Sequence, residues 1–165
     1  MIFLHEVVTG DDVARLAGLA DGVWHECFPG IITAGQIDYM VAKVQSVPAL
    51  TGQLAEGYRY FIVGDGRSDV GYIGLHPEPD AMFLSKLYLI KDARGHGYSS
   101  EMLAFVKGLC AASGIGTIRL TVNRGNAQAI AVYRAAGFKT VREQQADIGG
   151  GYIMDDYVME LRVLI

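Results

Sequence analysis

The chain contains few of the residues that cross-link small folds or bind metals. Of its 165 residues, 2 are Cys, 4 are His and 4 are Pro. The two cysteines form no CxxC pair, and the histidines show no metal-ligand spacing. These absences argue against a disulfide framework and against a zinc site. We therefore expect no metal.

Long hydrophobic runs and a strong net charge are also absent. No stretch approaches the roughly 18 uninterrupted apolar residues of a membrane span, and His5 and Glu6 interrupt the apolar start at once. This pattern predicts no membrane span, no signal peptide and a cytoplasmic location. The formal charge of −4 argues against nucleic-acid binding and is compatible with a cationic acceptor such as an amine.

The composition that is present is that of a folded chain. Hydrophobic residues make up 51% and charged residues 19%, which argues against disorder. The length predicts a single domain over residues 1–165 with one substantial core.

Hydrophobic periodicity, caps and turns predict a mixed fold. The expected strands are Ile2–Val8, Tyr58–Gly64, Val70–His76, Ala81–Ile90, Ile118–Val122, Phe138–Gln145 and Tyr152–Val163. The expected helices are Asp11–Val23 after a Thr9 cap, one after a Thr33 cap, a short one within Pro48–Glu56, Gly97–Ser113 and Asn126–Ala136. The fold class is α+β: a mixed, mostly antiparallel sheet of about seven strands with helices on both faces.

A short glycine-containing loop joins the Ala81–Ile90 strand to the next helix. It includes Arg94, Gly95, His96, Gly97, Tyr98, Ser99 and Ser100. The first N–H groups of a helix lack internal partners and carry the positive end of its dipole, and glycine lets the backbone approach a ligand. The hydroxyls of Ser99 and Ser100 and the charge of Arg94 add to this site, which suits a pyrophosphate.

Three phosphate-binding motifs compete for this loop. A P-loop needs a Lys followed by Ser or Thr after its second glycine, and that pair is missing. The dinucleotide fingerprint fails at its third glycine, which is Ser100 here. The loop resembles the R/Q-x-x-G-x-G/A motif of the GNAT N-acetyltransferase superfamily, with Ser99 where the family usually has Gly or Ala.

A downstream segment resembles the second signature of that superfamily, N-x-x-A-x-x-x-Y-x-x-x-G-F. Its fixed positions are Asn126, Ala129, Tyr133, Gly137 and Phe138. Asn126 and Tyr133 are seven residues apart and share a helix face, about 10 Å apart along the axis. Asn126 is placed to bond the pantetheine or phosphate region, and Tyr133 to reach the thioester sulfur. The resemblance covers Val70 to about Leu161.

The resemblance implies a GNAT-like three-layer fold and acetyl-CoA as cosubstrate. It also implies that the backbone of Leu87, Tyr88 and Leu89 pairs with pantetheine amides where the neighbouring parallel strand splays away. The residues themselves show only an apolar strand there. Aromatic candidates for the acceptor pocket, alternatively core residues, are Trp24, Phe28, Tyr39 and Tyr72.

The reaction expected is direct attack of a neutral amine on the thioester. A backbone N–H, that of Leu87 or Leu89, is expected to stabilise the oxyanion. Tyr133 is the expected general acid, because a phenol stays protonated at neutral pH and can protonate the departing thiolate. The base is left open between Glu78, which is also a candidate substrate contact, and His76, Glu26, His25 or a water chain.

The sequence thus predicts an acetyl-CoA-dependent N-acetyltransferase acting on a small-molecule amine. Acetylation of a protein N-terminus or lysine is a close variant, and a non-catalytic acyl-CoA sensor is an alternative from another class. The Tyr152–Val163 strand has an apolar face and no following element, so it is a candidate for pairing in a homodimer.

Overall fold

The computed structural model describes residues 1–164. Its elements, in chain order, are β1 (Phe3–Glu6), α1 (Gly10–Cys27), α2 (Ala34–Val44), α3 (Val47–Ala55), β2 (Arg59–Gly64), β3 (Asp69–Pro77), β4 (Met82–Leu89), a 3-10 turn η1 (Lys91–Ala93), α4 (Tyr98–Ala112), β5 (Thr117–Asn123), α5 (Ala127–Ala135), β6 (Lys139–Gly149) and β7 (Tyr152–Arg162).

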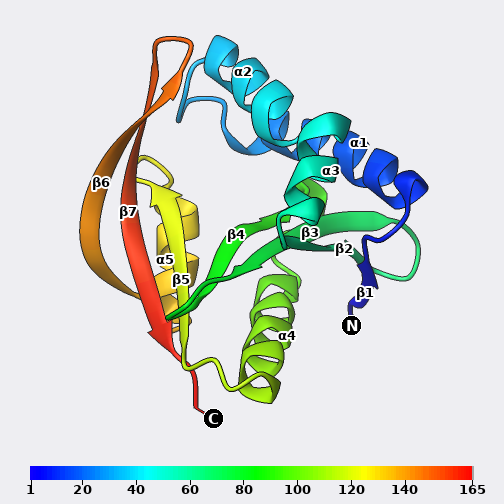
Figure 1. The fold of residues 1–165 in the computed structure, drawn as a ribbon, viewed down its shortest axis with the longest axis vertical. Helices are drawn as coiled ribbons and strands as arrows, with labels where there is room; N and C mark the ends of the chain where they lie inside the picture. Colours follow the sequence, from blue (N-terminus) through cyan, green and yellow to red (C-terminus); the bar gives the residue numbers. More distant parts are fainter. Residues whose placement is uncertain (165) are drawn as a thin grey trace.

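The strands form one seven-stranded sheet in the order β1-β2-β3-β4-β5-β7-β6. Every neighbouring pair is antiparallel except β4 and β5, which run parallel. The helix α4 makes the crossover between these two parallel strands, as such a pair requires. The predicted fold class, a mixed and mostly antiparallel sheet with helices on both faces, is confirmed (Figure 1).

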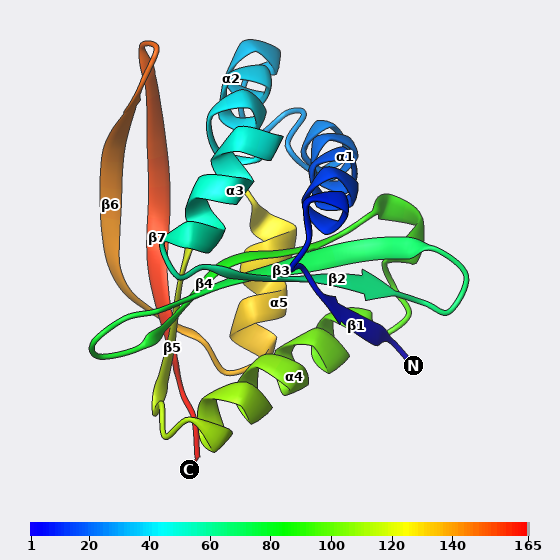
Figure 2. The same ribbon diagram turned by 45° about the vertical axis from the view of Figure 1, so that its right-hand side comes forward.

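Helices cover the two faces of the sheet unequally. Figure 2 shows α1, α2 and α3 on one side of the central strands and α4 on the other. The buried residues of α5 belong to the same core cluster as those of α4. The larger core lies under α4 and α5, where Met102, Val106 and Ile130 pack on Ile73 and Leu120. Two smaller clusters lie under α1–α3 and include Leu16, Leu50 and Tyr60 in one and Trp24, Phe28 and Met40 in the other.

The predicted caps explain where the first helices begin. Thr9 accepts from the backbone N–H of Asp12, and the Asp12 carboxylate accepts from the N–H of Thr9, which completes a capping box. Thr33 caps α2 through a single bond, its Oγ1 accepting from Gln36 N–H. The first helix extends beyond its predicted end at Val23 to Cys27, because Trp24 continues its buried face.

The prediction that the last strand offers a free edge for a dimer partner is wrong. Strand β7 lies between β5 and β6 and pairs with both, so β6 is the outer strand. Strands β6 and β7 form a hairpin, and β6 is longer than the predicted strand, since it continues past Gln145 to Gly149. Three glycines with positive φ make its turn, Gly149–Gly151. This long hairpin reaches the tip of α2 (Figure 1).

Within residues 1–164, no helix combines the length and the apolar character that crossing a membrane would need.

Candidate functional site

The two parallel strands at the centre of the sheet separate soon after they meet. Strands β4 and β5 are paired only at Met82–Ile118 and Phe83–Arg119. Beyond Phe83, β4 keeps its partner β3 but pairs with no strand of residues 1–164 on its other side, and Figure 1 shows the two strands diverging. A bulge at Ser85 accompanies the separation, because two residues of β4 there oppose one of β3. The predicted splay beside Leu87–Leu89 is confirmed.

The loop before α4 forms an open helix N-terminus beside this gap. Gly97 is the N-cap residue, with φ of 78°, and Gly95 has φ of 80°. Both values lie in the left-handed region that favours glycine. Among the described residues, no side chain caps the helix, and the first internal bond is from Glu101 N–H to the Gly97 carbonyl. The N–H groups of Tyr98, Ser99 and Ser100 therefore have no partner within the helix and suit an anion.

The two longer polar side chains of this loop differ in placement. Arg94 lines the gap, and its Nη2 donates to Cys27 Sγ over 2.9 Å, which ties the loop to the end of α1. The Glu26 carboxylate adds a second tie by accepting from Lys91 N–H at 2.7 Å. His96 does not line the gap, and its ring lies 5.6 Å from that of Tyr98.

The fifth helix places the second predicted pair of residues against the same gap. Asn126 is its N-cap residue, and Asn126 Oδ1 accepts from Ala129 N–H at 3.2 Å. Tyr133 lies two turns further along and is 8% exposed, with its ring edge-on to Phe138 at 5.6 Å. Burial raises the pKa of the Tyr133 phenol above its usual value, so this group stays protonated at neutral pH.

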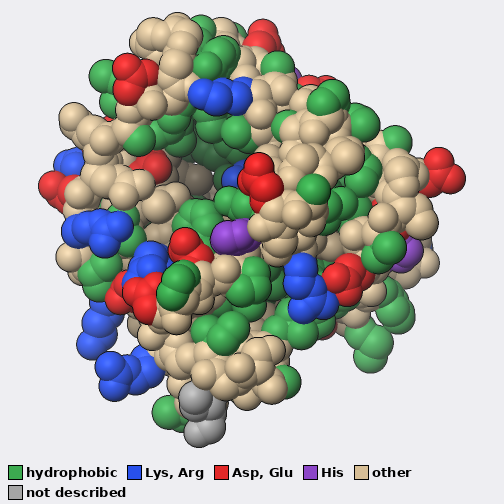
Figure 3. All heavy atoms as spheres, in the orientation of Figure 1, with side chains coloured by type: hydrophobic (Ala, Val, Ile, Leu, Met, Phe, Trp, Pro, Cys, Tyr) green, Lys and Arg blue, Asp and Glu red, His purple; other side chains and the backbone are tan. Residues whose placement is uncertain are grey.

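These elements enclose one cavity of about 640 Å³. Such a volume is typical of a ligand site. The cavity runs through the gap between β4 and β5: one end lies at the α4 loop and α5, and the other lies between α1, α2 and the β6–β7 hairpin. Figure 3 shows the surface hollowed between that hairpin and the helices α1 and α2.

An aromatic cluster forms part of the second end. Trp24 and Phe28 are stacked with ring centroids 4.5 Å apart, and Tyr88 meets both edge-on at 5.9 Å. All three line the cavity. Tyr72, also predicted to line the acceptor pocket, lies outside it and is fully buried. Its hydroxyl accepts from Trp24 Nε1 at 2.9 Å and donates to Gln45 Oε1 at 2.6 Å, so it supports Trp24 from behind.

The four side chains weighed as the base all lie away from this cavity. Glu78, also a candidate substrate contact, is exposed in the turn between β3 and β4 and does not line the cavity. His76 packs on Tyr58 at the same end of the sheet, with ring centroids 4.4 Å apart. His25 is engaged by Asp21 and Asp38, and Glu26 by the backbone of Lys91. Tyr39, the remaining aromatic candidate, donates to the Ile148 carbonyl instead.

Two charged residues that the sequence analysis did not select line the cavity. Lys86 comes from β4 and Asp156 from β7. Burial lowers the pKa of Lys86 to about 8 and raises that of Asp156 to about 6, while the opposite charge of each moderates both shifts. Asp156 could have been found from the sequence, because Met154, Asp156 and Val158 share one face of the predicted strand and the carboxylate interrupts its apolar character.

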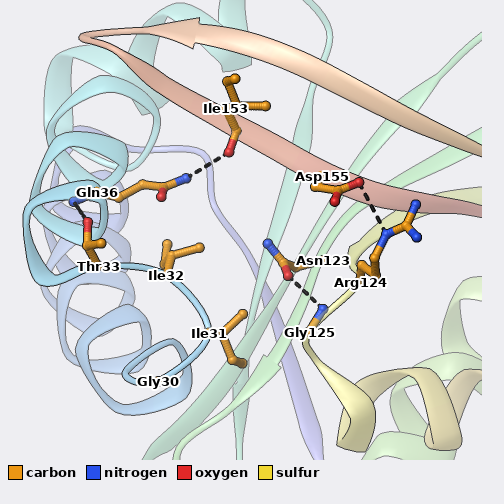
Figure 4. A pocket seen from close by; sticks show the side chains of 10 residues that line it. All are labelled: Gly30, Ile31, Ile32, Thr33, Gln36, Asn123, Arg124, Gly125, Ile153 and Asp155. Atoms are coloured by element: carbon orange, nitrogen blue, oxygen red, sulfur yellow. Dashed lines mark hydrogen bonds and ion pairs between the residues drawn. The ribbon is translucent and has the colours of Figure 1, made fainter.

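The other face of β7 borders a separate, shallower pocket, shown in Figure 4. Ile153 and Asp155 line it, while Met154 and Asp156 line the cavity described above. Asp155 accepts from Arg124 Nε at 3.2 Å, and Gln36 Nε2 donates to the Ile153 carbonyl at 3.3 Å. Because successive side chains of β7 point to opposite faces, Asp155 forms an exposed ion pair and Asp156 faces the interior.

Comparison with known proteins identifies relatives of the chain. The sequence model described as the acetyltransferase (GNAT) family matches residues 26–138. A mycothiol acetyltransferase from Clavibacter michiganensis subsp. michiganensis is 33% identical over 117 residues, which are 67% of this chain and 33% of that protein. The chain thus spans about a third of the length of this relative.

Solved structures share the fold over almost the whole chain. The PaiA N-acetyltransferase from Thermoplasma acidophilum, solved in complex with coenzyme A, superposes with a TM-score of 0.81 at 20% identity, covering 98% of this chain and 99% of that one. An acetyltransferase from Thermus thermophilus has a TM-score of 0.66 at 25% identity, with 98% and 97% covered.

Proposed function

Because the chain belongs to the acetyltransferase (GNAT) family, we propose that it is an acetyl-CoA-dependent N-acetyltransferase whose acceptor is a small-molecule primary amine. The observation that carries this proposal is the single cavity through the gap between β4 and β5. One of its ends offers an anion site and a phenol, and the other offers an aromatic wall and a carboxylate.

The donor end fits coenzyme A in its charges and its shape. The open N–H groups of Tyr98–Ser100 and the nearby Arg94 suit a pyrophosphate. A Cβ built on Gly95 or Gly97 would meet no atom within 4 Å, so the loop is open to a ligand there. In the part of the chain that the structure describes, no strand pairs with Leu87–Leu89 on its β5 side, which leaves backbone groups for the amides of pantetheine.

The thioester of acetyl-CoA supplies an activated acetyl group, and the protein supplies binding, orientation and proton transfer. Backbone N–H groups of Leu87 or Leu89 would stabilise the oxyanion formed by attack of the amine. The Tyr133 hydroxyl would protonate the departing thiolate. Burial of Tyr133 disfavours the phenolate, so the hydroxyl stays protonated until the thiolate departs.

The acceptor end supports a small molecule over a folded protein. The tip of the β6–β7 hairpin is tied to α2, because Tyr39 Oη donates to the Ile148 carbonyl at 2.9 Å and Lys43 Nζ donates to the same oxygen. The hairpin and α2 thus close over this end of the cavity, whose walls include Phe28, Met40 and Met154. An acceptor of this size and an apolar body suit these walls.

Thiol release from acetyl-CoA tests the proposal. We expect no appreciable release without an acceptor and strong stimulation by apolar primary amines such as benzylamine, 2-phenylethylamine or n-hexylamine. Short peptides with a free N-terminus or a lysine serve as the comparison panel. Stimulation by peptides alone would replace the small-molecule acceptor with a protein one. Coenzyme A binding without stimulation by any amine would favour a sensor and refute the enzyme.

A further inference from the structure

The acceptor end of the cavity holds one acidic side chain. Asp156 lies on β7 opposite Asn123 of β5 and Gln144 of β6, so its backbone is fixed on both sides. The residue is 6% exposed and lines the cavity. Within residues 1–164, Asp156 Oδ1 is the one buried side-chain oxygen or nitrogen that has no hydrogen-bond partner. A buried carboxylate oxygen without a donor is unusual, and the residue that carries it lines the cavity that a ligand would enter.

Lys86 does not satisfy that oxygen. Its Nζ donates to Ser85, to the hydroxyl at 2.9 Å and to the carbonyl at 3.2 Å. The bulge at Ser85 brings these acceptors under the ammonium group and directs the lysine to its own strand. Lys86 is close enough for its charge to lower the pKa of Asp156, but it gives Oδ1 no hydrogen bond.

We propose that Asp156 is the general base of the acetyl transfer, with its carboxylate accepting the N–H of the acceptor amine and then its proton. This assignment rests on the proposed function. It is a catalytic role, because the carboxylate would touch the reacting nitrogen. Lys86 acts through Asp156 as a positioning residue that favours the ionised carboxylate.

The step balances in protons and electrons. The nitrogen lone pair of the neutral amine forms the C–N bond, and the C=O π pair moves to oxygen. Asp156 removes the proton that the nitrogen can no longer hold. The oxyanion then re-forms C=O and the C–S bond breaks, with the Tyr133 proton going to sulfur. Asp156 returns its proton to water and the Tyr133 phenolate takes one back, so an amide and a thiol remain.

The groups around Asp156 set the pKa of its carboxyl in a range that suits a general base. Lys86 and Tyr88 face it from β4, and Asp155 precedes it on its own strand. Its neighbours on β5 and β6, Asn123 and Gln144, carry no charge. Burial and Asp155 raise its pKa, Lys86 lowers it, and the result of about 6 leaves it ionised at neutral pH. Tyr88 titrates far above this range, because burial raises its pKa.

Steady-state kinetics across pH with acetyl-CoA and benzylamine test the assignment. We expect Asp156→Asn to lower kcat about 100-fold or more, the size of a lost general base, with the Kd of coenzyme A kept within about twofold. The acidic limb of the kcat/KM profile should disappear in Asp156→Asn. In Lys86→Met that limb should move to higher pH, because the charge that favours the carboxylate is gone. Glu143→Gln, an exposed carboxylate on β6, is the matched control.

The possible failures are distinguishable. If the wild type turns over and Asp156→Asn keeps its kcat and its acidic limb, Asp156 is not the base while the proposed function stands. If Lys86→Met abolishes turnover at every pH and Asp156→Asn does not, the lysine is the base. If the wild type binds coenzyme A but acetylates no amine, the proposed function fails and the assignment fails with it. Asp156→Glu, which keeps the carboxylate, should recover part of the activity; no recovery over Asp156→Asn would contradict a role in proton transfer.

Discussion

Replacing Asp156 by asparagine should make the protein more stable at neutral pH while it loses activity. The substitution keeps the shape of the side chain and removes its charge. Asp156 is buried, and its Oδ1 has no hydrogen-bond partner within residues 1–164, so ionisation there is costly. If Asp156 serves as the base, its buried carboxylate lowers the free energy of unfolding in exchange for activity, a known trade-off at active sites.

The magnitude follows from the shift in pKa from 3.8 to about 6. Because the folded pKa lies above the unfolded one, the ionised carboxylate destabilises the folded state at high pH, and this cost fades as pH falls below 6. Linkage gives a cost of about 3 kcal/mol at pH 7.5 and about 1 kcal/mol at pH 4.5. The unpaired amide of asparagine retains roughly 1 kcal/mol of that cost, since it is also buried and polar.

Urea unfolding of wild type and Asp156→Asn at pH 4.5 and 7.5 measures these quantities. The variant should gain about 2 kcal/mol at pH 7.5 and nearly nothing at pH 4.5. Asp11→Asn, an exposed carboxylate in the first turn of α1, should show no such dependence. An equal effect of Asp156→Asn at both pH values, or a loss at pH 7.5, would refute the view of Asp156 as a buried, ionised and unpartnered group.

Three further substitutions separate the parts of the site. Tyr133→Phe should lower kcat about 100-fold with benzylamine and leave the Kd of coenzyme A within about twofold; full turnover would remove the acid role. Gly97→Ala should weaken coenzyme A binding about tenfold in calorimetry, because φ of 78° costs a side chain about 1–2 kcal/mol. Thr9→Ala should cost about 1 kcal/mol in urea unfolding through loss of the α1 cap. It should leave kcat unchanged, and a kinetic effect would show that α1 transmits strain to the site.

The donor end could be predicted because its determinants are local in sequence. Gly97 and the following serines specify an open helix start within one loop, and Asn126 and Tyr133 share one face of one helix. Short-range rules of capping and periodicity suffice for such features. The caps at Thr9 and Thr33 were predictable for the same reason.

The acceptor end could not be predicted, because its residues meet only through the order of the strands. Lys86 and Asp156 are 70 positions apart, and they line one cavity because β5 lies between β4 and β7 and splays from β4. The error at the last strand has the same origin, since nothing local in Tyr152–Arg162 shows that β6 will pair outside it. For Tyr72 the sequence left a pocket and a core position open, because an aromatic residue on a central strand can face a cavity or support its wall.

One measurement tests the central claim most directly: mass spectrometry of the products formed from acetyl-CoA with a deuterated acetyl group and benzylamine, together with the thiol released. We expect one labelled N-acetyl amine for each coenzyme A thiol, at a rate that depends on the amine. Thiol released without labelled amide would show hydrolysis, and no release despite coenzyme A binding would show a sensor. Either result would contradict an N-acetyltransferase.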